Sequence, residues 1–252
     1  MNVIPAPVWD AFKQFLLTAL QFFHGWVGDY GVAIMLLTIA MRIVMVPLTW
    51  KQTKSMYELQ AVQPKIKALQ EKYKNDKEKQ QEELMKFYQE NKVNPFGGCL
   101  PLLLQMPIFI ALYQVLGSPA KFTGPSFAKL LMSLEPAARE AAKRFWVILP
   151  DLTQTAGVVY KAAAKASVLA GIWQALPYII FVVLFGVSTW LPQYLMTKDP
   201  QQRRTGTYMA LMMLFFGWSV PGGVLIYWIT SSGIQVIQQT ITQRMLARSE
   251  GT

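Results

Sequence analysis

The sequence is poor in the residues that bind metals and form disulfides. Cys99 is the only cysteine and His24 the only histidine among 252 residues. A single cysteine excludes an intrachain disulfide, and a single histidine excludes zinc sites that need two or three imidazoles and proton relays built from several histidines. We therefore expect no resident metal, no cofactor and no catalytic side chain, and we look for function in the abundant residues.

Charged residues are also few. They make up 15% of the chain against 53% hydrophobic residues, which is too apolar for an ordinary water-soluble surface. A helix needs about 20 apolar residues to cross a hydrocarbon core of about 30 Å. Runs near this length predict an all-α membrane protein with five transmembrane helices, at residues 31–50, 99–118, 169–196, 207–220 and 221–243.

The N-terminal residues 1–30 form a different kind of segment. Within residues 10–27, polar side chains fall near one helical stripe and apolar side chains fill the rest, which predicts an amphipathic helix lying in the membrane interface. A sixth span is the competing interpretation. Residues 28–31, of sequence Gly-Asp-Tyr-Gly, supply a bend before the first span.

Polar segments separate the predicted spans. Residues 51–98 are rich in Lys, Glu and Gln, and their apolar residues recur at alternating steps of three and four, which predicts a cytoplasmic helical hairpin. Residues 119–168 form a long extracytoplasmic loop, in which alanine-rich stretches around 137–142 and 162–166 predict amphipathic helices with no assigned function. Residues 197–206 are a cytoplasmic loop, and residues 244–252 a short cytoplasmic tail.

Basic residues in the loops predict the orientation. With the N-terminus outside, the inner segments hold fifteen Lys and Arg residues and the outer segments eight. Because basic residues accumulate on the cytoplasmic side, this favours an outer N-terminus and a cytoplasmic C-terminus. The same basic loops would suit anionic lipid headgroups or ribosomal RNA, but orientation explains them well, and no DNA partner is expected.

Arg42 is the most informative residue, because it lies near the middle of the first span, where a guanidinium costs at least about 2.5 kcal/mol. No Asp or Glu lies in any of the five spans, so no intramembrane carboxylate can pair with it. Water in a polar cavity between helices is the remaining solvent for this charge. The alternative, snorkelling to the interface, is hard across about eight residues, or roughly 12 Å.

Neutral polar side chains could line such a cavity. The candidates are Thr38, one turn before Arg42; Gln105 and Gln114 in the second span; Gln174, Ser188 and Thr189 in the third; and Thr230, Ser231, Ser232 and Gln235 in the fifth. Hydrogen bonding between helices explains any single one of them equally well. Together they would form a wet groove around one unpaired cation, which would attract acidic or polar portions of a passing peptide.

Several motifs resemble one family. The second span opens with Asn94-Pro95-Phe96-Gly97-Gly98-Cys99-Leu100-Pro101, followed by Gln105-Met106-Pro107-Ile108-Phe109 and Ala111-Leu112-Tyr113. The last span follows Pro221-Gly222-Gly223 and contains Tyr227-Trp228 and Gln238-Gln239. With Arg42 and Pro47-Leu48-Thr49 in the first span, and Asp199-Pro200-Gln201-Gln202 in the second cytoplasmic loop, these stretches closely resemble the YidC family of membrane-protein insertases.

The resemblance, to the minimal five-span form of that family, implies a function. It implies a hydrophilic groove open to the cytoplasm and lipid, a bacterial cell (inner) membrane location, and insertion of nascent membrane-protein substrates into membrane lipids, alone or beside the Sec translocon. Arg42 would be the groove cation with Thr38 as its polar neighbour, and Phe109 and Trp228 would face the substrate, although packing explains Trp228 equally well. The short tail after Arg248 leaves ribosome contact in doubt.

Two other classes of protein share some of these features. A small-solute transporter or channel would also use polar groups within the membrane, but the halves show no inverted repeat, and no intramembrane carboxylate could bind a coupling cation. An intramembrane serine protease would need a histidine at membrane depth, whereas His24 lies outside the predicted spans. We therefore predict an insertase that is not an enzyme, with the transporter or channel as the alternative.

Overall fold

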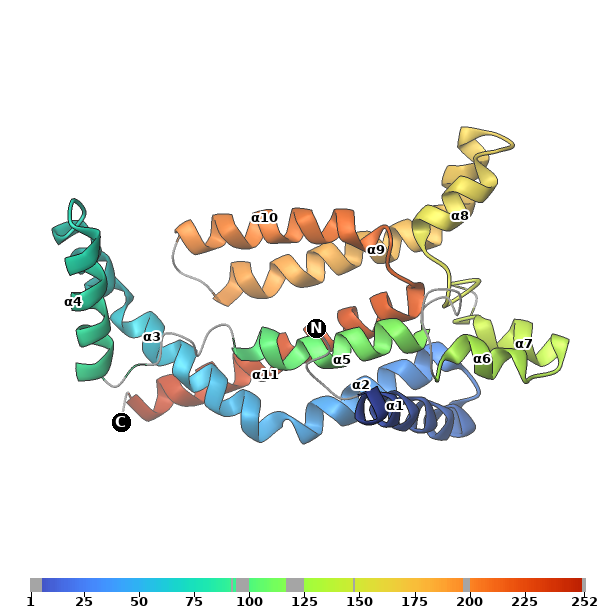
Figure 1. Ribbon diagram of the computed structural model, residues 1–252, viewed down its shortest axis with the longest axis horizontal. Helices are drawn as coiled ribbons and strands as arrows, with labels where there is room; N and C mark the ends of the chain where they lie inside the picture. The colour runs from blue at the N-terminus through green and yellow to red at the C-terminus, as the bar shows by residue number, and fades with distance from the viewer. Residues whose placement is uncertain are drawn as a thin grey trace. The chain divides into compact units, whose positions relative to one another are not determined.

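The structure is a computed structural model that describes residues 6–91, 93, 100–116, 125–146, 148–196 and 200–250. Within these ranges the chain is helical apart from turns and two isolated β-bridges, which confirms the predicted all-α class (Figure 1). The motif residues 94–99 and the loop residues 197–199 lie outside the described residues. The helices are α1 (Ala6–Val27), α2 (Tyr30–Val44), α3 (Val46–Lys72), α4 (Lys77–Glu90), α5 (Leu100–Leu116), α6 (Phe127–Met132), α7 (Pro136–Lys143), α8 (Ala156–Ala163), α9 (Val168–Met196), α10 (Pro200–Gly217) and α11 (Gly222–Glu250).

Among the described helices, α9 is long and apolar enough to cross a bilayer by itself, over Val168–Leu195. Helices α1 and α2 meet the same criterion only as a pair, and they are bent by 118° at their junction. Helix α5 contributes a shorter apolar stretch, Gln105–Leu116. The structure therefore gives one clear membrane-crossing helix, and the count of five spans stays a prediction.

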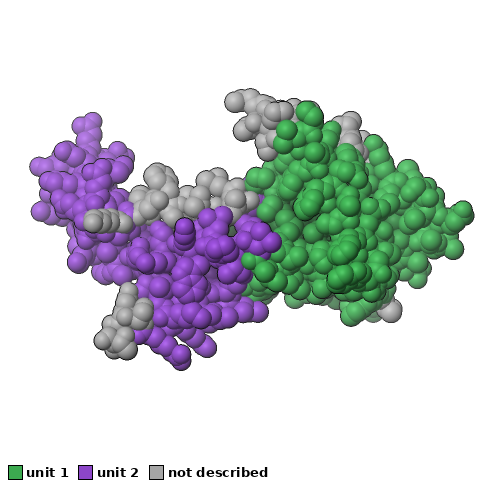
Figure 2. Space-filling model, turned by 90° about the horizontal axis from the view of Figure 1, so that it is seen from below, with its two compact units in different colours: residues 1–43, 107–235 green, residues 44–106, 236–252 purple. Residues whose placement is uncertain are grey.

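The chain divides into two compact units (Figure 2). Unit 1 comprises residues Met1–Ile43 and Pro107–Gln235, and unit 2 comprises Val44–Met106 and Val236–Thr252. The core of unit 1 is built from apolar side chains of α1, α2, α5, α9 and α11, including Leu16, Leu20, Ile34, Leu112, Leu116, Tyr178, Phe185 and Leu225. Because this core gathers helices from both ends of the sequence, it fixes the part of the fold in which the candidate site lies.

The corner between α1 and α2 lies where the sequence predicts a bend. Gly28 has a φ of +70°, a conformation that glycine adopts without a steric penalty. Asp29 then caps α2, because its Oδ1 accepts the backbone N–H of Val32 at 3.0 Å. Its other oxygen, Oδ2, accepts the backbone N–H of Trp146 at 2.8 Å. One carboxylate therefore begins α2 and joins it to a segment more than a hundred residues later.

The helix that carries Arg42 ends earlier than predicted. The sequence predicts one span over residues 31–50, whereas α2 ends at Val44 and a new helix, α3, begins at Val46. Pro47 lies in the first turn of α3. Proline cannot donate a backbone hydrogen bond, and its ring clashes with the carbonyl four residues earlier, so the helix is interrupted one turn before it.

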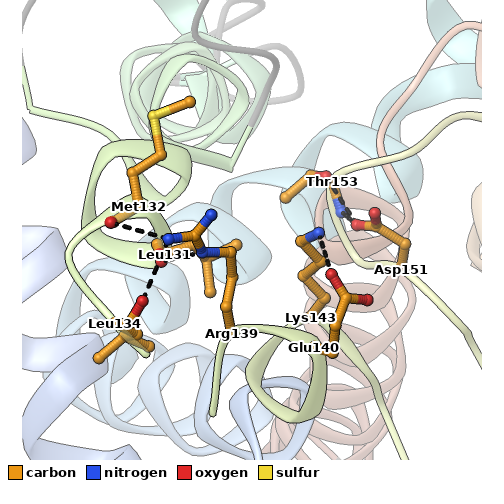
Figure 3. A network of polar contacts seen from close by, with 8 residues as sticks. All are labelled: Leu131, Met132, Leu134, Arg139, Glu140, Lys143, Asp151 and Thr153. Atoms are coloured by element: carbon orange, nitrogen blue, oxygen red, sulfur yellow. Dashed lines mark hydrogen bonds and ion pairs between the residues drawn. The ribbon is translucent and has the colours of Figure 1, made fainter. Parts of the chain in front are cut away.

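Two short helices, α6 and α7, follow Pro125 and are joined by one arginine (Figure 3). The Arg139 guanidinium donates to three backbone carbonyls at the end of α6: Nε to Leu131 at 2.9 Å, and Nη2 to Met132 and Leu134 at 3.0 and 3.1 Å. The last carbonyls of a helix lack N–H partners within the helix, so Arg139 supplies the donors for these carbonyls.

The turn between α10 and α11 packs tightly on the segment 152–154, which precedes α8. The backbone N–H of Gly223 donates to the Leu152 carbonyl, and that of Gly222 to the Gln154 carbonyl, both at 2.9 Å. A Cβ on Gly223 would lie 3.2 Å from the side chains of Ile34 and Leu116. The Pro-Gly-Gly sequence therefore serves as more than a break, because its glycines let the backbone approach the core closely.

Unit 2 contains a helical hairpin within the predicted range 51–98. Helices α3 and α4 pack together, with Ile66 buried on the predicted apolar seam. Asp76 caps α4 by accepting the backbone N–H of Lys79 at 3.0 Å, and the Gln80 amide donates to the Gln70 carbonyl at 2.6 Å. Pro64 lies inside α3.

Candidate functional site

The candidate site centres on Arg42, in the last turn of α2. Its side chain is only 7% exposed. Within the described part of the chain it forms no ion pair, as expected from the absence of carboxylates in the apolar runs. Burial of an unpaired cation is costly, so its hydrogen-bond partners decide whether the position is tolerable.

Two side chains of α11 hold the guanidinium. The Ser231 Oγ accepts from Nε at 2.9 Å and from Nη2 at 2.6 Å, and the Gln235 Oε1 accepts from Nη2 at 3.3 Å. Ser231 and Gln235 are four residues apart and therefore share one face of the helix. Both acceptors are neutral, so the positive charge is hydrogen-bonded without being cancelled.

A second hydroxyl extends this arrangement. Ser231 is also hydrogen-bonded to Tyr227, which lies one turn earlier on α11 and is buried. Because the Ser231 oxygen accepts twice from Arg42, its own proton is available for the Tyr227 oxygen. The three side chains thus form a chain of hydrogen bonds from the cation into the core of unit 1.

One guanidinium nitrogen is left over. Nη1 has no hydrogen-bond partner among the described residues, yet it is not one of the fully buried atoms that lack a partner. It is therefore not fully buried. A nitrogen with two N–H donors and a full positive charge behind it can bind water, a carboxylate or a peptide carbonyl there.

An aromatic cluster lies one turn before Ser231 on the same face of α11. The Trp228 ring meets the rings of Phe109 and Phe185 edge to face, with centroids 5.3 and 5.4 Å apart. Its Nε1 donates to the Thr189 hydroxyl at 3.1 Å. Trp228 and Ser231 are three residues apart, so the aromatic cluster and the cation site are neighbours on one helix face.

Other predicted groove residues hydrogen-bond within their own helices. The hydroxyl of Thr38 donates to the Ile34 carbonyl at 2.6 Å, and the hydroxyls of Ser188 and Thr189 both donate to the Phe185 carbonyl at 2.9 Å. Such bonds to the preceding turn are common for Ser and Thr in helices. Thr38 nevertheless lies one turn from Arg42 on the same face of α2.

The predicted glutamines differ in their contacts and exposure. Gln114 accepts the indole N–H of Trp9 at 2.9 Å and so ties α5 to α1. Gln174 is exposed near the start of α9. Gln105 belongs to unit 2 and is half-buried. Of the four predicted glutamines, only Gln235 therefore contacts Arg42.

Two residues of the site were missed from the sequence as functional candidates. Phe185 supplies both the ring that packs on Trp228 and the carbonyl that binds Ser188 and Thr189. Tyr227 was noted only as part of a motif. Its position four residues before Ser231 is the signal that could have identified it, because that spacing puts both hydroxyls on one helix face.

The described site consists of polar and aromatic groups. No group of three or more His, Cys, Asp or Glu side chains suited to a metal lies within the described residues. The site offers one cation, three hydroxyls, an amide and an aromatic surface. The hydrogen bonds of the Arg42 guanidinium to the described residues involve Nε and Nη2 and leave out Nη1.

Comparison with known proteins gives consistent relatives. Residues 22–249 match the profile of the family described as 60Kd inner membrane protein. The chain is 34% identical over 234 residues to the membrane protein insertase YidC of Fusobacterium nucleatum, which covers 92% of this chain and 95% of that protein.

Other relatives are longer proteins. The chain is 33% identical to the YidC of Geobacter sulfurreducens and 37% identical to that of Pseudoalteromonas atlantica. These matches cover 93% and 91% of this chain but only 38% and 36% of those proteins. A crystal structure of an active YidC insertase, with its first transmembrane domain resolved, is similar with a TM-score of 0.63 and 28% identity, covering 90% of this chain and 45% of that one.

Proposed function

The chain belongs to the 60Kd inner membrane protein family, to which the YidC membrane protein insertases belong, and from that premise we propose that it inserts polypeptide segments into a bilayer. In this proposal a substrate segment enters a hydrated groove that carries Arg42, and leaves it sideways into lipid. No covalent bond is made or broken, so the protein acts as an insertase and chaperone without enzymatic chemistry.

The observation that carries the proposal is the state of Arg42. Its charge is buried, has no carboxylate partner in the described chain, and is held by neutral acceptors while Nη1 stays accessible. Such a cation attracts acidic or polar portions of a passing chain, and the attraction is stronger where the surrounding dielectric constant is low. The attraction offsets part of the cost of moving those portions through the apolar layer.

The remaining predicted site residues are given supporting roles. We propose that Thr38, Gln105, Ser188, Thr189 and Ser231 provide polar lining, and that Phe109 and Trp228 give the apolar part of a substrate a surface to pack on. The contacts of Ser231 with Arg42 and of Thr189 with Trp228 support two of these assignments. The bonds of Thr38 and Ser188 to their own helices equally fit a purely structural role.

The finer topology also belongs to the proposal. We propose five spans at the predicted positions, with residues 1–30 as an interfacial segment, residues 51–98 as a cytoplasmic hairpin, and the orientation N-terminus outside and C-terminus cytoplasmic. The clear span α9 and the 118° bend after α1 support this placement, because so sharp a bend suits a helix that turns into the interface. Action alone or beside the Sec translocon rests on the family likeness, and ribosome contact is left open.

The proposal is tested by reconstitution. The purified chain is placed in liposomes and offered a small single-span protein with an acidic tail, and protection of the tail from added protease is measured. We expect protection with the chain and none in empty liposomes, and weaker dependence on the chain for a substrate whose tail is neutral. Release of a trapped solute without tail protection would contradict insertion and favour a transporter or channel.

A further inference from the structure

Helix α8 and the start of α9 form a helical hairpin, here called the α8–α9 hairpin and comprising residues 155–176. The two helices pack closely, since a Cβ on Gly171 would lie 3.0 Å from that of Ala164 and 3.1 Å from the Tyr160 ring. In Figure 1 they lie side by side and extend away from α10. The base of the hairpin is anchored by the Gly157 N–H, which donates to the Trp218 carbonyl at 3.1 Å.

One face of this hairpin is apolar and uncovered. Six of its large apolar side chains are exposed: Val158, Val168, Leu169, Ile172, Trp173 and Leu176. On α9 the exposed set continues through Ile180, Val183, Leu184, Val187 and Leu191. The exposed apolar face of the hairpin therefore continues without interruption into the exposed apolar face of the membrane-crossing helix.

The length of α9 places the hairpin at the membrane surface. Trp173 and Trp190 are separated by 17 residues, or about 26 Å of helix, which is close to the thickness of the hydrocarbon core. Tryptophan favours the two membrane interfaces. With these two side chains at opposite interfaces, Val168 and Leu169 lie one to two turns beyond Trp173 on the unbroken helix α9, at the level of the lipid headgroups.

The charge of the hairpin complements anionic lipid. Lys161 and Lys165 lie at its tip, both exposed, and neither forms an ion pair within the described chain. The sequence contains no Asp or Glu between Asp151 and Asp199. An apolar face, an exposed tryptophan and uncompensated lysines together are the features by which peripheral helices bind an anionic bilayer surface.

We propose that the α8–α9 hairpin is immersed in the headgroup layer of the outer leaflet, with Trp173, Leu169 and Val158 among the lipid headgroups and Lys161 and Lys165 on lipid phosphates. The inference rests on the membrane placement in the proposed function and not on insertion activity. Its role is to hold the outer end of α9 at a fixed depth, where the helix would otherwise be free to slide or tilt.

The test uses the whole chain reconstituted in vesicles, with Cys99→Ala and a new cysteine, Ala166→Cys, at the exposed tip. A fluorescent label on this cysteine is quenched either by iodide in water or by lipids with a nitroxide on the headgroup. Vesicles contain phosphatidylcholine alone or mixed with phosphatidylglycerol. Ala137→Cys on α7 serves as the aqueous reference, and Val183→Cys on α9 as the hydrocarbon reference.

We expect headgroup nitroxide to quench the label at position 166 more strongly than the label at position 137. The quenching at position 166 should increase when phosphatidylglycerol is added. Lys161→Glu with Lys165→Glu should remove the phosphatidylglycerol effect, which is worth about fivefold per lysine in the ratio of bound to free hairpin. Lys129→Glu, a single charge reversal in the same loop that is to be compared with Lys161→Glu alone, should leave it intact. Iodide quenching equal to that at position 137 would overturn the proposal, as would protection from both quenchers, which would indicate a second protein on this face.

Discussion

The guanidinium of Arg42 and the hydroxyl of Ser231 meet across 189 positions of sequence, through two hydrogen bonds of 2.9 and 2.6 Å to a single oxygen. The Ser231 hydroxyl accepts both bonds through its two lone pairs, and it is also hydrogen-bonded to Tyr227. The neutral acceptors therefore hold the guanidinium in one position without neutralising its charge. Electrostatic attraction of a substrate requires a charge held in this way.

Variants of Arg42 should distinguish the contribution of its charge to insertion from the contribution of its shape. Arg42→Ala and Arg42→Glu are expected to lower insertion of a substrate with an acidic tail by about tenfold or more, the usual effect of losing a charged hydrogen bond. Arg42→Lys keeps the charge but lacks the forked N–H donors of the guanidinium, so it should retain more activity than the other two variants. Rates of tail protection in liposomes measure this, and equal rates for all three variants would rule out an electrostatic role.

Ser231→Ala should destabilise the protein, because it leaves two buried donors of Arg42 without an acceptor. The expected loss is about 1–3 kcal/mol of unfolding free energy. Thermal unfolding in detergent measures it. Ser231→Thr keeps the hydroxyl and is the matched control; if Ser231→Ala melts at the same temperature as Ser231→Thr, the two hydrogen bonds do not matter for stability.

Gly31 and Gly25 provide a matched pair of glycine replacements. A Cβ at Gly31 would lie 2.1 Å from the ring of Phe145, which is buried, whereas one at Gly25 would meet nothing within 4 Å. Gly31→Ala should therefore lower the melting temperature markedly through overpacking. Gly25→Ala, in the interior of α1, should be neutral or stabilising by up to about 1 kcal/mol. Similar melting of both variants would show that α2 does not pack on Phe145 this closely.

Arg139 should control the order of the loop that contains α6 and α7. Arg139→Lys keeps the charge but cannot make all three carbonyl bonds, so the connection after Met132 should become more open to protease. Limited proteolysis of the purified protein measures the cleavage rate. Arg144→Lys, at an exposed neighbouring position, is the control and should cleave at the wild-type rate. Unchanged cleavage of Arg139→Lys would mean that the three bonds do not hold this loop.

His24 should make stability depend on pH. Burial lowers the pKa of its imidazole below 6.5, and the Asp29 carboxylate partly opposes this. The folded state then binds the proton less readily than the unfolded state, so stability is full above pH 6.5 and falls as the pH drops below that value. His24→Phe can keep the stacking on Tyr30, where the ring centroids are 3.8 Å apart, but cannot titrate. Melting temperatures across this range should therefore change less in the variant, and identical pH profiles would contradict the assignment.

The sequence predicted the helical class and the special position of Arg42 for the same reason. Both depend on local context: a run of apolar residues is visible without any fold, and so is a charge within it that has no carboxylate in the neighbouring runs. The bend at Gly28 was also predictable, because a glycine between two helical patterns marks a local backbone requirement.

The sequence could not choose among its polar candidates. Ser231 and Ser232 are adjacent and both buried, yet only Ser231 holds Arg42, while Ser188 and Thr38 bond to their own helices. The helix break between Val44 and Val46, inside the predicted span 31–50, was likewise not predicted, since the effect of Pro47 on the preceding turn depends on the backbone path.

The sequence by itself determined that a cation without a carboxylate partner lies within an apolar helix, because composition and periodicity are properties of neighbouring residues. Only the tertiary structure decided that Ser231 and Gln235 would accept its hydrogen bonds, with Tyr227 bonded to Ser231. Which face of α11 turns toward α2 depends on the packing of side chains from distant helices, and no local pattern encodes that choice.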